Sequence, residues 1–471
     1  MKLKAVLLAA LLAGAALVLG LLLRPAAPPP HRAPLLVIGI DGGEWKVIRR
    51  LWSEGELPHL KAIAERGVTA TLRTAYNASP VIWTTIATGV TPPVHGITDF
   101  VVATPRGNVP VSSTVRRVPA LWNMLSRSGR RVAVLGWWAS WPAENVNGVV
   151  VTDRALRNLE ARVFPPSYLP RFLADLRQAD ADPGLFQADD PQRQDRVMAR
   201  SAARLVNEGY DLVLLYFRTP DLVSHNEWKY FEPRGFAWVD PWELAQRRDR
   251  IPRVYEAVDR EIGRILAAAP PSTNVLVLSD HGFHAAPRED VKALVDMNAV
   301  LERLGYLARR PDGEVDFSRS RIYTYGTPDF QRTKMLRFGP VKPAERASLR
   351  RRLEADLAAV TNGRGAPLFL LREARPRRGE NGDLVAVVRL PRLTPVLRVR
   401  GRPFPRALRI VGRISGTHGA LTHGIFLAAG PDIDPAAKLE GFHIHDVAPT
   451  ILYGLGLPVA EDFAGRPWMD L

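Results

Sequence analysis

Six acidic and imidazole side chains in this sequence lie directly after aliphatic runs or in the short loops beside them. They are Asp41, Asp221, His225, Asp280, His281 and His418. Carboxylates and imidazoles together suit zinc or a similar divalent ion, and the chain has no cysteine to supply thiolate ligands. Six such residues also suffice for two ions that share one site. We therefore predict a divalent metal centre, provided that the fold brings the six side chains together.

Each of these residues also has a purely structural interpretation. Asp41 precedes two glycines, where an aspartate often stabilises a turn. An aspartate that follows a strand, as Asp280 does, is commonly a helix cap. We favour the metal site because four separate segments carry the same kinds of ligand at their ends. Asp221 and His225 are four residues apart, so they can face one ion if their segment is helical.

The assignment of the sixth ligand depends on local sequence. His418 and His423 both stand between a threonine and a glycine, so His423 is an alternative. We prefer His418 because Ser415 and Gly416 precede its threonine. The other histidines are interpreted as structural, in the case of His95, or as loop or surface residues, namely His284, His443 and His445.

A nucleophile is predicted at Ser79. Residues 77–89 are typical of a turn followed by a short helix that begins near Pro80 or Val81, because proline favours the first helical turn and serine the N-cap. Ser79 would then lie at the positive end of the helix, where an alkoxide and an incoming phosphate are both stabilised. Taken alone, Ser79 is more simply an ordinary cap. Beside a metal centre, the nucleophile is the better interpretation.

Aliphatic runs alternate with amphipathic stretches through most of the chain, which predicts the elements that position these residues. Strands are expected at residues 35–40, 131–135, 149–152, 212–217, 274–278 and 425–429. Helices are expected at residues 57–66, 120–128, 193–207, 254–268 and 446–455. We predict an α/β fold with a mostly parallel sheet covered by helices on both faces. The carboxyl ends of its strands would share the edge at which functional residues gather.

The alternation of strands and helices is interrupted in one segment, which predicts an inserted domain. Residues 291–411 contain an arginine-rich helix near residues 344–357 and short alternating strands, so they are expected to form an α+β cap. The domain organisation that we predict is an anchor or signal segment at 1–24, a proline-rich linker at 25–33, a catalytic core at 34–290 and 412–471, and the cap between them.

The N-terminal segment predicts where the protein works. Lys2 and Lys4 precede 19 apolar residues, 5–23, which Arg24 closes. A run of this length spans a bilayer, and the charge balance places the N-terminus in the cytoplasm. We expect an inner or plasma membrane anchor with the folded part in the periplasm or outside the cell. Secretion after signal cleavage is the alternative.

Composition limits the class of protein and of partner. The chain has 471 residues, of which 46% are hydrophobic and 24% charged, and this balance excludes overall disorder. The formal net charge of +16 favours anionic partners, such as phosphate esters or acidic lipid headgroups. Nucleic acid is disfavoured because the positive charge is spread along the chain. The sequence leaves the oligomeric state open.

Taken together, the motifs resemble those of the alkaline phosphatase superfamily, in particular its type I phosphodiesterase/nucleotide pyrophosphatase branch. The segments that carry the resemblance are residues 37–42, 79–89, 92–97, 220–225, 278–282, 416–419 and 446–458. The resemblance implies an alkaline-phosphatase-like fold with two zinc ions. Asp221, His225 and His418 would hold one ion, and Asp41, Asp280 and His281 would hold the other.

The same resemblance implies a reaction. Ser79 would bridge toward the second ion as the nucleophile and pass through a phosphoseryl intermediate, which makes the chain a metal-dependent phosphoric ester hydrolase, most simply a phosphodiesterase. Relatives often have threonine at this position, which leaves the chemistry unchanged. Nucleotide-cleaving relatives are expected to bind the phosphoryl oxygen through an asparagine three residues after the nucleophile, where this chain has Ile82. Nucleotide pyrophosphatase activity is therefore not carried over, although Asn77 or the backbone of residues 79–81 is a possible substitute.

Other activities of the superfamily fit less well or remain open. A sulfatase needs proline two residues and arginine four residues after the nucleophile, whereas Pro80 directly follows Ser79 and Trp83 is the fourth residue. A cofactor-independent phosphoglycerate mutase would be cytoplasmic. The alternatives that remain are a phosphomonoesterase, a transferase of phospho-headgroups and a catalytically silent binding protein. The aromatic-rich residues 226–250 are either a rim beside the site or a packed lid.

Overall fold

The computed structural model describes residues 33–104, 107–181, 191–324, 333–373, 384–389 and 396–469. The predicted membrane segment at residues 1–24 lies outside this part of the chain. Within the described residues, no helix combines the length and the apolar character that crossing a bilayer requires.

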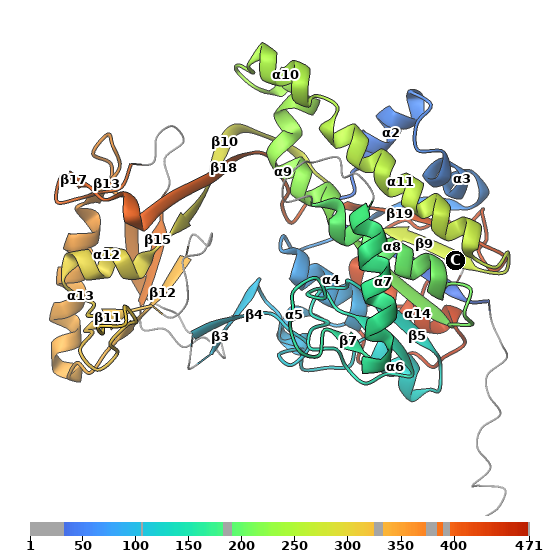
Figure 1. The fold of residues 1–471 in the computed structure, drawn as a ribbon, viewed down its shortest axis with the longest axis horizontal. Helices are drawn as coiled ribbons and strands as arrows, with labels where there is room; N and C mark the ends of the chain where they lie inside the picture. Colours follow the sequence, from blue (N-terminus) through green and yellow to red (C-terminus); the bar gives the residue numbers. More distant parts are fainter. Residues whose placement is uncertain are drawn as a thin grey trace, which may run out of the picture.

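An eight-stranded sheet forms the centre of the molecule (Figure 1). Its strand order is β2-β19-β9-β1-β8-β5-β6-β7. The strands are β1 (Leu35–Ile40), β2 (Val68–Leu72), β5 (Val132–Leu135), β6 (Gly148–Val151), β7 (Val163–Phe164), β8 (Leu212–Phe217), β9 (Asn274–Leu278) and β19 (Gly424–Ala429). Strands β9, β1, β8, β5 and β6 pair in parallel, while β19 runs antiparallel to both β9 and β2. The predicted α/β fold is confirmed.

Helices cover both faces of the sheet because its strands are apolar on both sides. On β1, Leu36 and Ile38 belong to one hydrophobic layer, whereas Leu35 and Val37 belong to the opposite one. The first layer packs against α2 (Trp45–Ser53), α3 (Pro58–Arg66), α7 (Leu169–Ala181), α8 (Gln192–Leu205), α9 (Thr219–Phe231) and α11 (Arg250–Ala268). The second packs against α4 (Ser79–Thr88), α6 (Leu121–Arg127) and α14 (Val447–Gly454).

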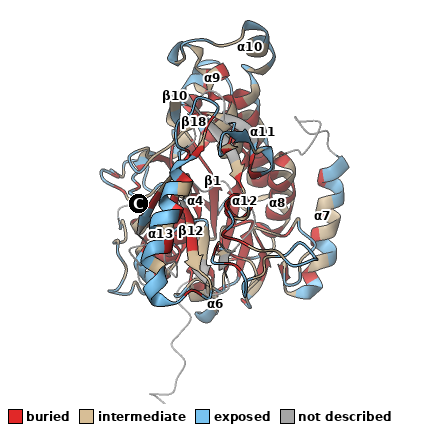
Figure 2. Ribbon diagram, turned by 90° about the vertical axis from the view of Figure 1, so that its left-hand side faces the viewer, coloured by how far each residue is buried: buried red, intermediate tan, exposed pale blue. Residues whose placement is uncertain are grey.

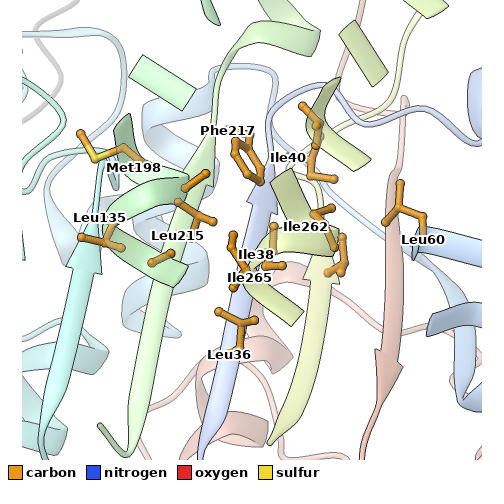
Figure 3. Close-up of a cluster of buried hydrophobic side chains, with 14 of the residues drawn as sticks. Leu36, Ile38, Ile40, Leu60, Leu135, Met198, Leu215, Phe217, Ile262 and Ile265 are labelled. Carbon is orange, nitrogen blue, oxygen red and sulfur yellow. The ribbon is translucent and has the colours of Figure 1, made fainter. Parts of the chain in front are cut away.

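The packing of these layers is visible directly. Figure 3 shows Ile38 of β1 beside Leu215 of β8, with Ile262 and Ile265 of α11 lying over them. Figure 2 shows that buried residues concentrate in the strands and on the inner faces of the helices. Shorter elements lie around these layers: α5 (Pro92–His95), α10 (Pro241–Arg247), η1 (Pro166–Tyr168), η2 (Pro233–Gly235), η4 (Ile444–Asp446) and the hairpin of β3 (Val101–Thr104) and β4 (Gly107–Pro110).

A second lobe lies to one side of the sheet, joined to it by the antiparallel pair β10 (His284–Val295) and β18 (Leu408–Thr417) (Figure 1). The predicted cap boundaries, at 291 and 411, fall within these two strands. The lobe contains α12 (Met297–Leu304), β11 (Ile322–Tyr323), β12 (Thr333–Phe338), α13 (Pro343–Ala358), β13 (Val360–Thr361), β14 (Phe369–Glu373), β15 (Leu384–Val388), β16 (Arg398–Val399), β17 (Arg402–Pro403) and η3 (Pro405–Ala407). Its hydrophobic core is formed by residues between Val295 and Leu408.

Candidate metal centre

The first group of potential ligands lies at the carboxyl ends of the two central strands. Asp41 directly follows β1, and Asp280 with His281 follows β9, which pairs with β1 in parallel. One ligand atom from each residue lies within 4.8 Å of the other two. All three residues are buried, and His281 Nε2 is 3.5 Å from Asp41 Oδ1 and 3.2 Å from Asp280 Oδ2. The parallel strands thus bring together residues about 240 positions apart in the chain.

The second group combines a helix with a loop. Asp221 and His225 are one helical turn apart on α9, which follows β8, and His225 Nε2 lies 3.4 Å from Asp221 Oδ1. His418, directly after β18, completes the group, because its Nε2 lies 4.0 Å from the same carboxylate oxygen. The helical conformation that the spacing of Asp221 and His225 requires is therefore present.

The two groups form one continuous site. The imidazole rings of His281 and His418, one from each group, stack with centroids 3.5 Å apart and planes 6° apart. His281 Nε2 also lies 3.9 Å from Asp221 Oδ1. The six side chains that the sequence singled out therefore converge at one edge of the sheet. The first group has two carboxylates and one imidazole, and the second has one carboxylate and two imidazoles.

Backbone carbonyls orient two of the imidazoles. His225 Nδ1 lies 3.0 Å from the Gly416 carbonyl, and His281 Nδ1 lies 3.0 Å from the Gly282 carbonyl. A carbonyl accepts only from a protonated nitrogen, so Nδ1 of each ring carries a proton and Nε2, which faces the carboxylates, is the nitrogen that could bind a cation. Burial, together with nearby His281, lowers the pKa of His418 to about 2, so this ring is neutral. Neutral imidazoles with a fixed tautomer are the form that binds metal ions.

Several buried polar atoms in the site have no hydrogen-bond partner among the described residues. They are Asp221 Oδ1, Asp280 Oδ2 and His418 Nδ1. Buried polar groups are almost always satisfied, and a buried carboxylate oxygen without a partner is costly. Two unsatisfied carboxylate oxygens that face neutral imidazole nitrogens fit divalent cations, because a cation would satisfy both kinds of atom.

The electrostatics of the carboxylates lead to the same conclusion. Burial raises the pKa of Asp280 to about 7, and the charge of Asp221 acts in the same direction. Burial also raises the pKa of Asp41 well above its ordinary value, with further contributions from Asp280 and Asp221. Burial opposes the ionisation of Asp221 too, but His225 outweighs it and holds that pKa below its ordinary value. Without cations, the site concentrates negative charge that the protein itself does not neutralise.

Ser79 lies beside the first group of ligands. Its hydroxyl donates to Asp41 Oδ1 at 3.3 Å, lies 3.4 Å from His281 Nε2, and is buried. The predicted role of Ser79 as the helix cap is wrong: α4 begins at Ser79 itself, and extended Ala78 precedes it without a side-chain cap. Because Ser79 is not used in capping, its side chain turns from the helix toward the metal ligands.

The position of His418 corrects one step of the sequence argument. A residue that precedes a parallel strand lies at the opposite edge of the sheet from the strand's carboxyl end. His418 precedes β19 and still reaches the other ligands, because β19 runs antiparallel to β9 and therefore begins at their edge. His423 lies closer to β19, but its Nδ1 accepts from the backbone N–H of Thr74, outside both groups.

The position singled out for phosphoryl binding has a different environment from the one expected. Ile82 is completely buried in the hydrophobic layer between α4 and the sheet. Ile82 is not among the residues that line the cavity at the site. Asn77, one of the suggested substitutes, is exposed.

Histidines outside the two groups have structural contacts. His95 is buried, with Nε2 3.0 Å from the Thr85 hydroxyl, as expected of a structural residue. His284 is exposed. His443 and His445, predicted to be loop or surface residues, lie at the short helix η4 and form a half-buried stacked pair whose Nδ1 atoms are 2.8 Å apart.

The aromatic-rich residues 226–250 were predicted to form either a rim beside the site or a packed lid, and the structure shows a packed part and an exposed part. Trp228 is completely buried and stacks on Phe283, two residues after His281. Trp238, which precedes α10, is 70% exposed, and Trp242, on α10, is 73% exposed. The segment is therefore a packed support for α9 at its beginning and an exposed surface beyond it.

A cavity of about 500 Å³ opens onto the site and includes residues that the sequence analysis did not single out. Tyr216, on β8, donates a hydrogen bond from its hydroxyl to Asp41 Oδ2, and Trp138 Nε1 donates to the same hydroxyl at 2.7 Å. Arg218 lies between β8 and α9. These residues follow or end strands, as the ligands do, but they have no motif around them that would mark them.

The fold and the site together define a class: a mostly parallel sheet with paired Asp/His groups and a buried serine at its carboxyl edge is that of an alkaline-phosphatase-like phosphoric ester hydrolase. Residues 35–389 match the sequence profile of the type I phosphodiesterase / nucleotide pyrophosphatase family, and the chain belongs to that family. Members of this family are hydrolases and are generally metal-dependent, with two divalent ions. The chain is therefore a metal-dependent phosphoric ester hydrolase of the phosphodiesterase type.

Solved structures resemble the chain in fold. Human ectonucleotide pyrophosphatase / phosphodiesterase 5 is 16% identical, and the match covers 92% of this chain and 97% of that one with a TM-score of 0.50. The murine protein of the same name is 17% identical, with 91% and 96% covered and a TM-score of 0.49. Phosphonoacetate hydrolase from Sinorhizobium meliloti 1021 is 16% identical, with 90% and 96% covered and a TM-score of 0.47. No curated protein matches the sequence significantly.

Proposed function

We propose that the chain is a two-zinc phosphodiesterase in which Ser79 is the nucleophile. The observation that carries the proposal is the position of the buried Ser79 hydroxyl, within 3.4 Å of the first ligand group, which in turn adjoins the second. The donor set of carboxylates and imidazoles suits zinc. Bound divalent ions would increase the acidity of the hydroxyl and stabilise the charge on the departing oxygen.

The residues of the chain themselves account for orientation and proton position. Ser79 already directs its hydroxyl hydrogen at Asp41 Oδ1, and Tyr216 holds the other oxygen of that carboxylate. In the proposed reaction, Ser79 Oγ loses its proton and forms a bond to phosphorus as the bond from phosphorus to the leaving oxygen breaks, and that oxygen takes up a proton to leave as the alcohol. Water then cleaves the phosphoseryl ester and restores the hydroxyl. Asp280 and His281 form a completely buried floor beneath the cavity from which substrate and water would approach.

Substitution of Ser79 tests this proposal. The purified chain should hydrolyse bis(p-nitrophenyl) phosphate faster than p-nitrophenyl phosphate, lose activity in a chelator and regain it with zinc. Ser79→Ala should lower kcat by at least about 10³-fold, because the nucleophile is lost. Ser79→Thr, which keeps a hydroxyl, is the matched control and should retain activity. Mass spectrometry of quenched wild-type enzyme should find phosphate on Ser79.

Other results of the same experiment would favour other functions. Full activity of Ser79→Ala would exclude the covalent route. A faster monoester reaction would indicate a phosphomonoesterase, and product transfer to added glycerol would indicate a transferase. A purified protein without bound metal and without activity would indicate a binding protein.

We also propose that residues 1–24 tether the enzyme to the inner or plasma membrane, with the catalytic domain on the outer side. The sequence of that segment supports the proposal, and so does the direction of β1. The described residues begin at Ala33, just before β1, and Asp41 directly follows the other end of β1, so a tether would join the sheet at the edge opposite the site. The cavity would then face away from the bilayer. The anionic phosphoester would be approached from solvent.

The tether predicts a simple fractionation result. The full chain should sediment with membranes and resist extraction by salt or carbonate, whereas a chain that begins at residue 33 should be soluble and equally active. If expression of the full-length chain instead yields a soluble protein whose N-terminus lies after residue 24, the segment is cleaved as a signal peptide.

A further inference from the structure

A second cavity continues the catalytic one along the same edge of the sheet. The metal ligands occupy the ends of β9, β1 and β8, and the second cavity of about 360 Å³ lies at the ends of the next strands, β5 and β6. Trp138 follows β5, while Asp153 and Arg154 follow β6. Because these strands are parallel, their carboxyl ends form one continuous floor for both cavities.

The two cavities share one wall. Phe100, Trp138, Tyr216 and Arg218 line both of them. Phe100 is 45% exposed and meets Trp138 edge to face, with ring centroids 5.9 Å apart. Tyr216 links this wall to the metal site through its hydrogen bond to Asp41. A substrate whose phosphate lies beside Ser79 therefore has a direct path over the aromatic wall into the second cavity.

The second cavity carries an excess of positive charge. Arg154, Arg157 and Arg218 line it, and Asp153 is the one acidic residue among its described lining. Arg154 lies 3.8 Å from Asp153, which neutralises one of the three cations. Burial raises the pKa of Asp153 to about 6, so the carboxylate remains mostly charged at neutral pH. About two positive charges are left for a ligand.

Arg218 is the one arginine that lines both cavities, and its guanidinium is held by the neutral amide of Gln194. Its Nη1 donates to Gln194 Oε1 at 3.1 Å. The nearby carboxylate of Asp195 accepts from the backbone N–H of Arg218 and interacts with the guanidinium only at longer range. Gln194 fixes the guanidinium without cancelling its charge. An arginine held in this way keeps N–H donors and full charge for an anion, which it can bind in bidentate fashion.

We propose that the second cavity binds a second anionic group of the substrate. The preferred substrate would be a phosphodiester in which one alcohol also carries a phosphate or a carboxylate, with the diester at the metal site and the second anion near Arg218 and Arg157. This inference rests on the proposed function, because it assigns the substrate class of the same site. The combined volume of the cavities suits a ligand larger than a simple dialkyl phosphate.

Matched chromogenic substrates test the proposal. The probes are p-nitrophenyl phosphodiesters of an alkanediol with arms of three and six carbons, each ending in a hydroxyl, a carboxylate or a phosphate. The full-length enzyme should prefer at least one anionic arm over the hydroxyl arm of equal length by about tenfold or more in kcat/KM, because a charge-assisted hydrogen bond is about twice as strong as a neutral one. The carboxylate and phosphate arms show which anion is preferred. Equal rates for all arms, or a preference for the hydroxyl arm, would overturn the proposal.

Variants locate the effect. In Arg218→Gln the ratio of anionic to hydroxyl kcat/KM should fall toward one, whereas Arg218→Lys, which keeps the charge, should retain part of the preference. Arg157→Gln, at an exposed position that is less critical for folding, should lower the ratio as well. Arg66→Gln is the control, because Arg66 lines a different cavity at the opposite edge of the sheet, and it should leave both activity and ratio unchanged. An unchanged ratio in both the Arg218→Gln and Arg157→Gln variants would contradict the proposal.

A binding experiment separates this inference from the proposed function. If no probe is hydrolysed, the phosphodiesterase proposal fails, but calorimetric titration of Ser79→Ala with hexane-1,6-diol bisphosphate still tests the cavity. Tight binding that weakens about tenfold in the additional Arg218→Gln background would support the second anion site. Binding that is absent, or equal in both proteins, would exclude it.

Discussion

At the scale of single residues, the site is defined by charge that the fold has concentrated without neutralising. Asp280 and Asp41 are completely or nearly completely buried, and each has a raised pKa because burial and the neighbouring carboxylates disfavour its charge. Stability and function therefore conflict at these positions. Such a conflict is typical of active sites, where charged groups are kept for chemistry at a cost to folding.

Replacing one of the buried carboxylates should expose this conflict. In the presence of a chelator, Asp280→Asn should increase the free energy of unfolding by about 1–3 kcal/mol, because it removes one of the repelling charges. The same variant should bind fewer zinc ions per chain. Chemical denaturation with and without chelator, together with elemental analysis, measures both effects.

The matched control for this variant is a carboxylate in solvent. Asp312→Asn changes an exposed aspartate of the second lobe and should alter neither quantity. If Asp280→Asn were less stable than the wild type in chelator and kept its metal content, the side chain would be a structural hydrogen-bonding group and not a ligand.

At the scale of elements, the placement of α9 depends on a residue of another helix. The residue before α9, Arg218, offers no side-chain cap. Asp195 of α8 supplies it instead, because its two carboxylate oxygens accept from the backbone N–H groups of Arg218 and Thr219 at 3.0 Å each. Asp195 thereby fixes the first turn of the helix that carries Asp221 and His225. It is a positioning residue for the second ligand group.

The buried cap also predicts a pH dependence. Burial raises the pKa of Asp195 from 3.8 to about 6. A raised pKa means that the folded state binds a proton more tightly than the unfolded state, so the stabilisation is complete below about pH 4 and is lost as pH rises through 6. The free energy of unfolding of the wild type, relative to that of Asp195→Asn, should therefore be larger at pH 5 than at pH 7.5 by about 1.4 kcal/mol, because the roughly one pH unit between pH 5 and the folded-state pKa of about 6 lies in this interval.

Guanidinium denaturation of both proteins at the two pH values measures this difference. Asp195→Asn should also weaken zinc binding. The side-chain amide accepts only through its oxygen, so one of the two backbone N–H groups at the start of α9 loses its partner and the helix that carries Asp221 and His225 is held less firmly. A pH-independent difference between the two proteins would show that the carboxyl group does not change its charge in this range.

At the scale of the whole molecule, the second lobe and the sheet have separate hydrophobic cores. The lobe's core contains residues from Val295 to Leu408, and these two residues form the last pair of the ribbon that joins the lobe to the sheet. The metal ligands, in contrast, all lie on elements of the central sheet or at its edge, with His418 just beyond β18. The geometry of the metal centre should therefore not depend on the lobe.

Removing the lobe tests this separation. A chain in which an Asn-Gly turn replaces residues 296–407 joins Val295 to Leu408 through a connection that suits antiparallel strands. It should fold, bind the same number of zinc ions as the full chain, and hydrolyse bis(p-nitrophenyl) phosphate in a reaction that requires Ser79. Loss of metal binding in a shortened chain that keeps its far-UV circular dichroism would show that the lobe supports the site.

Much of the fold follows from local sequence. The aliphatic runs of β1 and β8 are continuous because both faces of these strands are covered, and such runs predict parallel strands without knowledge of their neighbours. The ends of these runs identify Asp41 and Asp221, and the end of β9 identifies the pair at 280–281. Short or exposed strands such as β2, with alternating burial, carry a weaker signal and were not predicted.

The sequence by itself determined the kinds of ligand, the strand ends that carry them and the serine beside them, because each of these depends on a few neighbouring residues. The direction of β19, which brings His418 and not His423 to the second group, depends on hydrogen bonds between strands distant in the chain. The shared wall of Trp138 and Arg218 likewise exists only because β5 and β8 are neighbours in the sheet. Only the tertiary structure decides such pairings, since their free energy comes from contacts between segments that local sequence does not relate.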